Sequence, residues 1–241
     1  MAKRKFYFTL YELSDKLTTL FLFNLFWLML NIPVILLVTQ LLVVTQLSSY
    51  YILGPLLVLT LPVFFYPSTQ ALFCVVRDLI LDQGSLTLKS FWTYFRTNYK
   101  ESLMTGIMFT GGFVGVCTGL FYSWSMSFVV FTLFLVLLFY ILIMMIQLFS
   151  FQAHFNMPIW WKLKRIHQLV FAKIFYSISS LLAVSLILYA TLEMSLFVFV
   201  LAAPAASVYS AFFLFKAQYN KIMRLSKQNS KRLDTSKILE V

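Results

Sequence analysis

Six apolar segments, each long enough to cross a lipid bilayer, constrain the fold of this chain more than any other feature. They cover about residues 17–47, 51–81, 102–122, 128–151, 174–192 and 196–215. A helix spans the hydrocarbon core with about 20 predominantly apolar residues. Charged residues make up only 11% of the chain, against about 25% in a typical soluble protein. The sequence therefore predicts an all-α polytopic membrane helix bundle, with six transmembrane helices in one membrane domain over residues 1–215.

The basic residues indicate how these spans are oriented. If the N-terminus is cytoplasmic and the spans alternate, all 19 Lys and Arg residues fall on the cytoplasmic side. Glu193 is then the only charged residue in the outer turns. Because basic residues near span ends stay in the cytoplasm, we expect both termini to be cytoplasmic, with residues 216–241 as a basic cytoplasmic tail. Anionic lipid headgroups also explain the basic excess, so we expect a lipid bilayer and no nucleic acid as partner.

Two segments between the spans have the pattern of amphipathic helices. In residues 88–100 a mostly aromatic stripe at helical spacing runs beside a basic one. The aromatic stripe consists of Phe91, Trp92, Phe95 and Tyr99 together with Leu88. The second segment follows Pro158, and its apolar face consists of Ile159, Leu163, Ile166 and Val170. Aromatic faces flanked by basic residues are typical of interfacial helices. We expect two cytoplasmic interfacial helices on the inner leaflet, with docking to a protein partner as the alternative.

The third apolar segment has a face of small residues. Gly111, Gly115 and Gly119 are spaced four apart and therefore share one side of a helix. Small residues at this spacing let a second helix approach closely. This second helix belongs either to the same chain or to a partner. The candidate partner interface combines these glycines with residues of the aromatic and basic stripes, namely Gly111, Gly115, Gly119, Trp92, Phe95 and Arg96.

Polar and helix-breaking residues within the first two spans form a second candidate site. Asn24 and Asn31 are seven residues apart, hence on one helix face, with Trp27 between them. Pro62 and Pro67 lie in the second span, where each ring removes a backbone hydrogen bond. Membrane amides usually bond to neighbouring helices. A substrate site on this intramembrane face is the alternative.

The residues that enzymes need are scarce in this chain. Cys74 and Cys117 both fall within apolar spans and are too few for a disulfide framework or a metal cluster. No phosphate loop, dinucleotide fingerprint or nucleophile elbow occurs. We therefore expect no enzymatic activity, no catalytic residue, no metal and no cofactor. Asp78, Asp82 and His154 would have to converge on a metal to support a membrane-bound enzyme.

Three parts of the chain resemble the YesL-like family of bacterial integral membrane proteins. They are Asn24-Leu-Phe-Trp27 followed by Pro33, then Tyr66-Pro67-Ser68-Thr69-Gln70-Ala71-Leu72, and then Phe91, Phe95 and Asn98-Tyr99-Lys100. In the second part, Tyr66 and Ser68 stand where the family pattern has glycine and alanine. The chain also has extra length between Pro33 and Pro67 relative to that pattern.

This resemblance implies a bacterial plasma membrane and an association with carbohydrate importers of the ATP-binding-cassette type. It implies no catalytic residues. The chain has no nucleotide-binding domain and no acidic-Ala-Ala coupling motif of an importer permease. We expect an accessory membrane protein that assists assembly, stability or regulation of such an importer, with its permease or ATPase subunits as partners. The alternative is a stand-alone small-solute transporter or channel.

Overall fold

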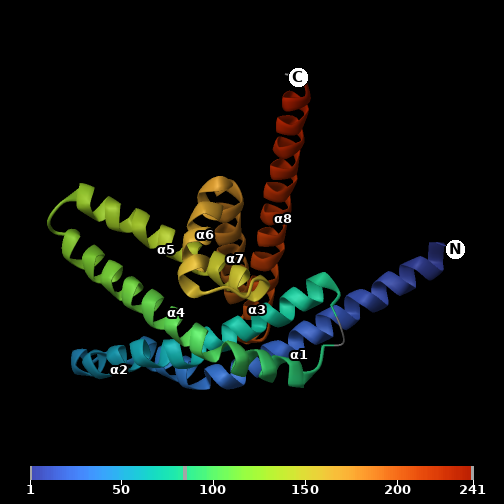
Figure 1. Ribbon diagram of the computed structural model, residues 1–241. Helices are drawn as coiled ribbons and strands as arrows, with labels where there is room; N and C mark the ends of the chain where they lie inside the picture. The colour runs from blue at the N-terminus through green and yellow to red at the C-terminus, as the bar shows by residue number, and fades with distance from the viewer. Residues whose placement is uncertain (1, 84–85, 240–241) are drawn as a thin grey trace.

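The computed structural model describes residues 2–83 and 86–239, with side chains for 14–83 and 86–228 and for Tyr7 and Tyr11. Within these residues it is helical and contains no strand (Figure 1). The elements are α1 (Ala2–Val43), α2 (Leu47–Thr60), the π-helix η1 (Leu61–Phe65), α3 (Tyr66–Leu81), α4 (Leu88–Ser123), α5 (Phe128–His154), α6 (Ile159–Ala172), α7 (Ile174–Met194) and α8 (Leu196–Leu239).

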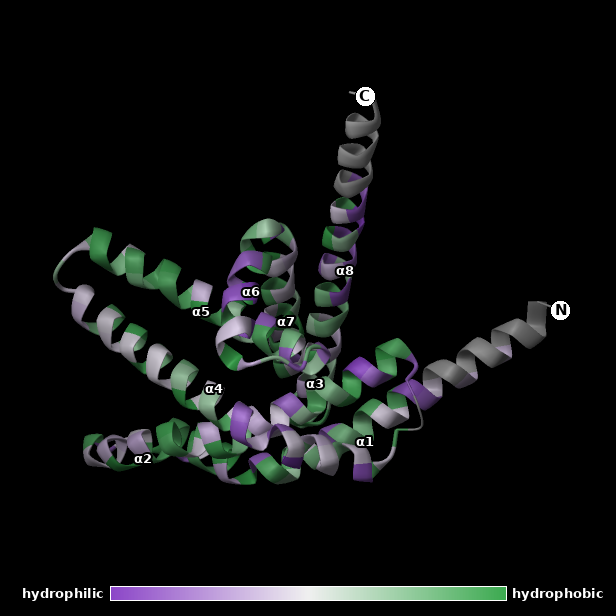
Figure 2. Ribbon diagram, viewed as in Figure 1, coloured by the Kyte–Doolittle hydropathy of each residue, from purple (hydrophilic) through white to green (hydrophobic). Residues whose placement is uncertain are grey.

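Six helical segments of the described residues are long and apolar enough to cross a membrane. They are Ser14–Val43, Leu47–Leu81, Leu88–Ser123, Phe128–His154, Ile174–Met194 and Leu196–Gln228. Apolar residues dominate the outer part of α5 and alternate with weakly polar ones along α2 and the outer part of α4, while hydrophilic ones gather at the start of α4, along α6 and on α8 (Figure 2). The predicted six-span helical membrane bundle is confirmed.

Helix α3 is the centre of this bundle. Every residue from Tyr66 to Val76 is buried, and α1, α4, α5 and α8 all pack around the helix. By contrast, α2 has no buried residue, although the two helices form one continuous helical segment. The difference follows from the side chains, because α2 has no charged or amide side chain, whereas α3 has Gln70, Arg77 and Asp78, which need protein partners.

The π-helix η1 joins these two halves. Pro62 is the second residue of η1, and Pro67 is the second residue of α3. Each proline lacks the N–H that a regular α-helix needs, and the wider turn of a π-helix accommodates the interrupted hydrogen-bond ladder. The sequence predicts a break in this span from its prolines, and the structure has it as this local widening.

Two predicted boundaries differ from the structure. The segment 88–100 is helical, but it continues without a break into the third span as the single helix α4. No Pro or Gly occurs between Leu88 and Glu101, and an uninterrupted helix keeps every backbone group bonded. The expected tail is likewise continuous with the span before it, since α8 continues through residue 216 to Leu239. Neither Pro nor Gly follows Pro204, and the segment is rich in helix-forming residues.

Candidate functional site

The predicted polar face of α1 lies inside the bundle, and Asn24 connects it to α8. Its Nδ2 donates to the carbonyl oxygens of Val200 (3.1 Å) and Leu201 (2.7 Å). The backbone N–H of Ala205 donates in turn to Asn24 Oδ1 at 3.2 Å. Pro204 has no N–H for the Val200 carbonyl four residues earlier. Asn24 therefore supplies the donor that this proline removes from α8.

Trp27 and Asn31 bond to the first turn of α3. Trp27 Nε1 donates to Thr69 Oγ1 at 3.0 Å, and Asn31 Nδ2 donates to Ser68 Oγ at 2.7 Å. These acceptors directly follow Pro67, so the structure brings that proline beside the predicted face. Asn31 as a residue is 1% exposed. Its Oδ1 atom has no hydrogen-bond partner among the described residues.

Pro62 lies at a close approach between η1 and α4. A Cβ atom on Gly106 of α4 would lie 2.9 Å from Pro62 Cα and 2.9 Å from Tyr66 Cγ. Such a distance is shorter than real Cβ contacts, so only glycine fits there. Gly106 is thus a packing glycine of the third span, although the four-residue spacing does not single it out. Pro62 takes part in helix packing and is buried.

A charged cluster fills the far end of α3. Arg77 contacts Asp78 Oδ1 through Nε (2.8 Å) and Nη2 (2.6 Å), and it also donates to the carbonyl of Ala153 on α5. Tyr94 of α4 donates to Asp78 Oδ2 at 2.5 Å, and the Arg77 guanidinium lies 5.5 Å from the centre of its ring. Both oxygens of the buried carboxylate are thereby bonded, and the cluster holds α3, α4 and α5 together.

The three residues of the hypothetical metal site have other contacts. Asp78 belongs to the cluster above, while Asp82 forms an ion pair with Lys16 at 3.1 Å. His154 lies among aromatic rings, with the ring centres of Phe155 and Tyr219 at 4.6 and 5.8 Å. Within the described part of the chain, no group of three His, Cys, Asp or Glu residues is placed to hold a metal ion.

One feature that the sequence analysis missed is a buried ion pair between α4 and α6. Lys162 is 1% exposed, and its Nζ lies 2.5 Å from Glu101 Oε1. Glu101 also lines an open hollow of about 550 Å³ between α4 and the turn before α6. A signal was present, because Lys162 stands four residues before Ile166 and thus on the predicted apolar face of α6.

A second polar cluster joins α5, α7 and α8. Gln147 Nε2 donates to Gln218 Oε1 at 3.2 Å, and Gln218 Nε2 donates to Ser177 Oγ at 3.2 Å and to the Leu169 carbonyl at 2.9 Å. Gln147 Oε1 has no partner among the described residues. Gln147 is visible in the sequence as an amide within a span, but its partners become visible only when the helices are packed.

The candidate partner interface is divided by the structure. Gly111 and Gly115 are exposed, and a Cβ added to either would meet no atom within 4 Å. Gly119 faces inward instead, since its added Cβ would lie 2.3 Å from the Phe134 ring on α5. The Phe134 contact makes Gly119 an internal packing residue, and it leaves Gly111 and Gly115 as the open part of the glycine face.

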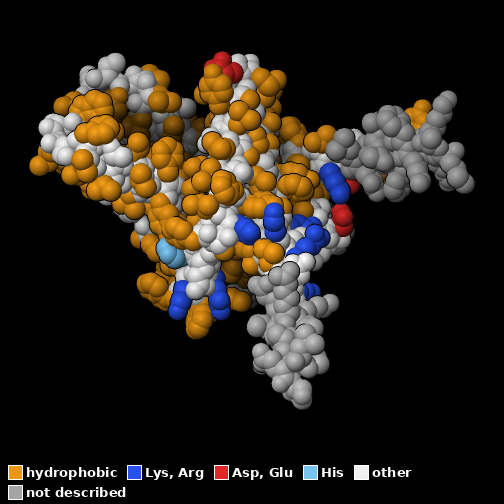
Figure 3. Space-filling view, turned by 90° about the horizontal axis from the view of Figure 1, so that it is seen from above, with side chains coloured by type: hydrophobic (Ala, Val, Ile, Leu, Met, Phe, Trp, Pro, Cys, Tyr) orange, Lys and Arg blue, Asp and Glu red, His pale blue; other side chains and the backbone are white. Residues whose placement is uncertain are grey.

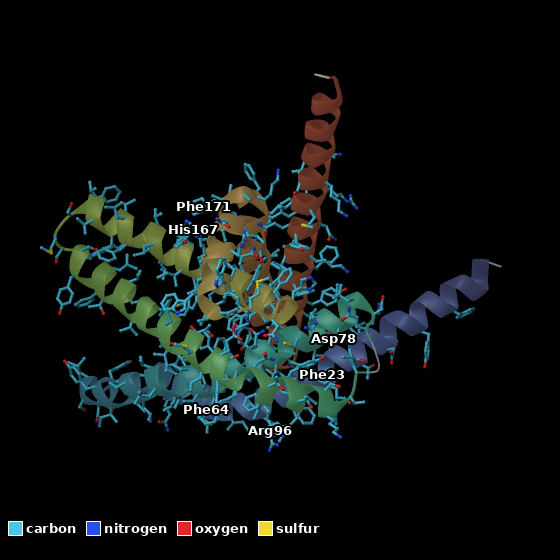
Figure 4. The ribbon with its side chains drawn as sticks, viewed as in Figure 1. Phe23, Phe64, Asp78, Arg96, His167 and Phe171 are labelled. Atoms are coloured by element: carbon cyan, nitrogen blue, oxygen red, sulfur yellow. The ribbon has the colours of Figure 1, made fainter. Side chains whose placement is uncertain are left out.

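The aromatic and basic stripe at the start of α4 is also divided. Phe91 is fully buried and stacks on Phe23 of α1 with ring centres 6.1 Å apart. Trp92 is exposed and stacks on Phe95 at 5.4 Å, and the Arg96 guanidinium lies 5.2 Å from the Trp92 ring centre. Figure 4 shows Phe23 within the bundle and Arg96 pointing away from it. Trp92 and Arg96 are therefore available to lipid or to a partner.

Comparison with known proteins gives one match. Residues 20–119 match a family model described as "Protein of unknown function, DUF624". The match covers α1 from residue 20, the whole of α2, η1 and α3, and most of α4, which includes all three parts that carry the resemblance drawn from the sequence. No curated protein and no solved structure matches the chain.

Proposed function

We propose that this protein is an accessory subunit of a bacterial carbohydrate importer. Residues 20–119 match the DUF624 family, to which the YesL-like proteins belong. The six helices of the described residues that are long and apolar enough to cross a bilayer support a multi-pass membrane protein. The importer is of the ATP-binding-cassette type, and the membrane is the plasma membrane. The subunit assists assembly, stability or regulation of the permease. Its own chemistry is helix packing and not catalysis.

The open glycine face of α4 carries this proposal. Gly111 and Gly115 leave the α4 backbone uncovered, and exposed Ile107, Met108 and Val114 lie around them. A face of small residues lets a partner helix approach closely and gain van der Waals contact. A permease helix is a suitable occupant, because it brings a complementary apolar surface within the same bilayer.

The use of the interior polar groups also supports a packing role. Asn24, Trp27 and Asn31 all bond to neighbouring helices through their donor groups. The charged cluster of Arg77 and Asp78 likewise bonds to α4 and α5. Side chains engaged in this way stabilise one arrangement of the bundle. A substrate would have to compete with these bonds.

Affinity purification in mild detergent at native expression, followed by mass spectrometry, tests the proposal. We expect permease or ATPase subunits of a sugar importer at near-stoichiometric amounts. Gly115→Val should remove most of this material, because the added methyl groups keep a partner helix from approaching the α4 backbone. Gly54→Val is the matched control, since Gly54 of α2 also has open space around it, and it should leave the yield unchanged. Recovery of the protein alone, or equal losses in both variants, contradicts the proposal.

A second candidate function, transport of a small solute by the protein itself, is favoured by one observation. The carbonyl oxygens of Asn31 and Gln70 are buried without partners among the described residues, close to the π-helix. Such acceptors suit a hydroxyl-bearing solute. Uptake by the purified protein alone in liposomes, abolished by Asn31→Leu and retained in Gly115→Val, would establish this function and exclude the accessory role as the main one.

A further inference from the structure

The outer face of α6 is composed of aromatic and basic side chains. Trp160 and Trp161 are 74% and 58% exposed, and Phe171 is 57% exposed. Lys164 and Arg165 are exposed beside them. The opposite face of α6, with Lys162, Ile166, Leu169 and Val170, is buried against the bundle. Because the inner face already packs on protein, the outer face must contact the membrane surface, the cytoplasm or a ligand.

The polar groups of this outer face are almost all hydrogen-bond donors. Each indole offers one N–H, and Lys164 and Arg165 offer several more. Among the described residues neither indole N–H has an acceptor, and neither basic side chain has a carboxylate within 4 Å. The one acceptor in contact is Gln168, whose Oε1 receives a long bond of 3.4 Å from Arg165. A donor-rich, positively charged surface is complementary to a ligand that carries only acceptors and negative charge.

The shape and place of this face identify the ligand class further. Trp160, Trp161 and Lys164 line a hollow of about 170 Å³, which offers space for a few water molecules and hence for a phosphate group. Figure 4 shows His167 and Phe171 on the same helix, and Tyr140 of α5 contacts His167 Nδ1 at 2.6 Å. In Figure 3, Lys and Arg side chains are interleaved with hydrophobic ones over part of the surface. Indole rings favour the headgroup level of a bilayer.

We propose that Trp160, Trp161, Lys164 and Arg165 form a binding site for the phosphate of an anionic phospholipid in the cytoplasmic leaflet. The cations attract the phosphate, the indole N–H groups donate to its oxygens, and the aromatic rings contact the upper acyl chains. The inference is independent of the proposed importer, because it concerns only this chain and lipid.

Lipid titration of the purified full-length protein in detergent tests the site, with thermal unfolding and native mass spectrometry as readouts. Phosphatidylglycerol should raise the midpoint of unfolding and remain bound, while phosphatidylcholine with the same acyl chains should do neither. Inorganic phosphate alone should give no shift, which separates a lipid site from a site for free phosphate. Lys164→Gln with Arg165→Gln should weaken phosphatidylglycerol binding about 25-fold, since each basic residue near an anionic surface contributes about fivefold.

The control is Lys221→Gln with Arg224→Gln, which removes the same charge from exposed positions on α8 and should leave binding within about twofold of the wild type. Equal loss in both double variants means a diffuse attraction of all basic residues, and it overturns the site. Equal stabilisation by both lipids, or by free phosphate, overturns it as well. Should the α6 variant fail to fold, the wild-type protein still provides a test, because equal stabilisation by phosphatidylglycerol and phosphatidylcholine overturns the site without any variant.

Discussion

The side chain of Asn24 on α1 supplies a hydrogen bond that is missing in another helix, α8. Its amide donates to two carbonyls of α8 beside Pro204 and accepts from the N–H of Ala205. In a bilayer no water replaces these bonds. Asn24 of α1 thus replaces the backbone hydrogen bond that Pro204 removes from α8. The same bonds fix α1 and α8 to each other at this point.

We expect Asn24→Leu to lower the free energy of unfolding by about 2 kcal/mol, since three hydrogen bonds of modest individual strength are lost. Unfolding in mixed micelles measures this change. Pro204→Ala should then restore part of the loss in the Asn24→Leu protein, because the N–H of alanine can bond to the Val200 carbonyl. Strictly additive effects of the two substitutions would show that Asn24 does not act through the proline.

The Lys162–Glu101 pair leads to a prediction about unequal partners. Lys162 is fully buried, while the Glu101 side chain is 27% exposed. Glu101→Leu leaves a buried ammonium without its carboxylate and should cost about 3 kcal/mol. Lys162→Met leaves a carboxylate that water can still reach, so it should cost clearly less.

The double variant Lys162→Met with Glu101→Leu serves as the control for this pair. It removes both charges and should be close to Lys162→Met alone in thermal unfolding. If Glu101→Leu proves no more harmful than Lys162→Met, the ammonium is better solvated than its burial indicates.

At the scale of elements, the surroundings of α4 change along its length. Near the start, Phe91 and Tyr94 anchor the helix to α1 and α3. In the middle, Gly106 allows the backbone to touch the π-helix. One turn further on, Gly111 has open space around it. The same residue type thus has a packing role at one position and leaves a free surface at the other.

Gly106→Ala and Gly111→Ala form a matched pair that tests this contrast. The methyl group at position 106 would overlap Pro62 and Tyr66, so we expect a loss of about 2 kcal/mol in stability. At position 111 it meets nothing, and the higher helix propensity of alanine should leave stability unchanged or raise it by less than about 1 kcal/mol. Thermal unfolding in detergent compares the two, and equal effects would contradict the close contact with η1.

The existence of the helices could be predicted better than their ends. Apolar length and the position of basic residues predict six spans, and the structure has them. The sequence did not predict that α4 runs unbroken from Leu88 or that α8 extends to Leu239, because a change from apolar to basic side chains alters the solvent of a helix without ending it. Only a lost backbone bond or a competing cap does that.

For the molecule as a whole, the sequence could predict those features of the candidate sites that depend on one helix, but not those that depend on a second helix. Spacing within one helix placed Asn24, Trp27 and Asn31 on a common inner face, as the structure has them. Spacing could not distinguish Gly119, which packs on Phe134, from Gly115, which is open, because that depends on a second helix. The partners of Lys162 and Gln147 likewise come from distant segments, which a pattern within one helix cannot reveal.

The central place of α3 has a consequence for how the protein is made. α3 leaves the ribosome before α4 and α5 are synthesised, yet α4 and α5 provide groups that bond Gln70, Arg77 and Asp78. Lys216 on α8, which bonds the Ile80 carbonyl, is synthesised later still. A helix with these side chains is poorly soluble in lipid by itself. The membrane insertion machinery therefore has to shelter α3 until its neighbours are synthesised.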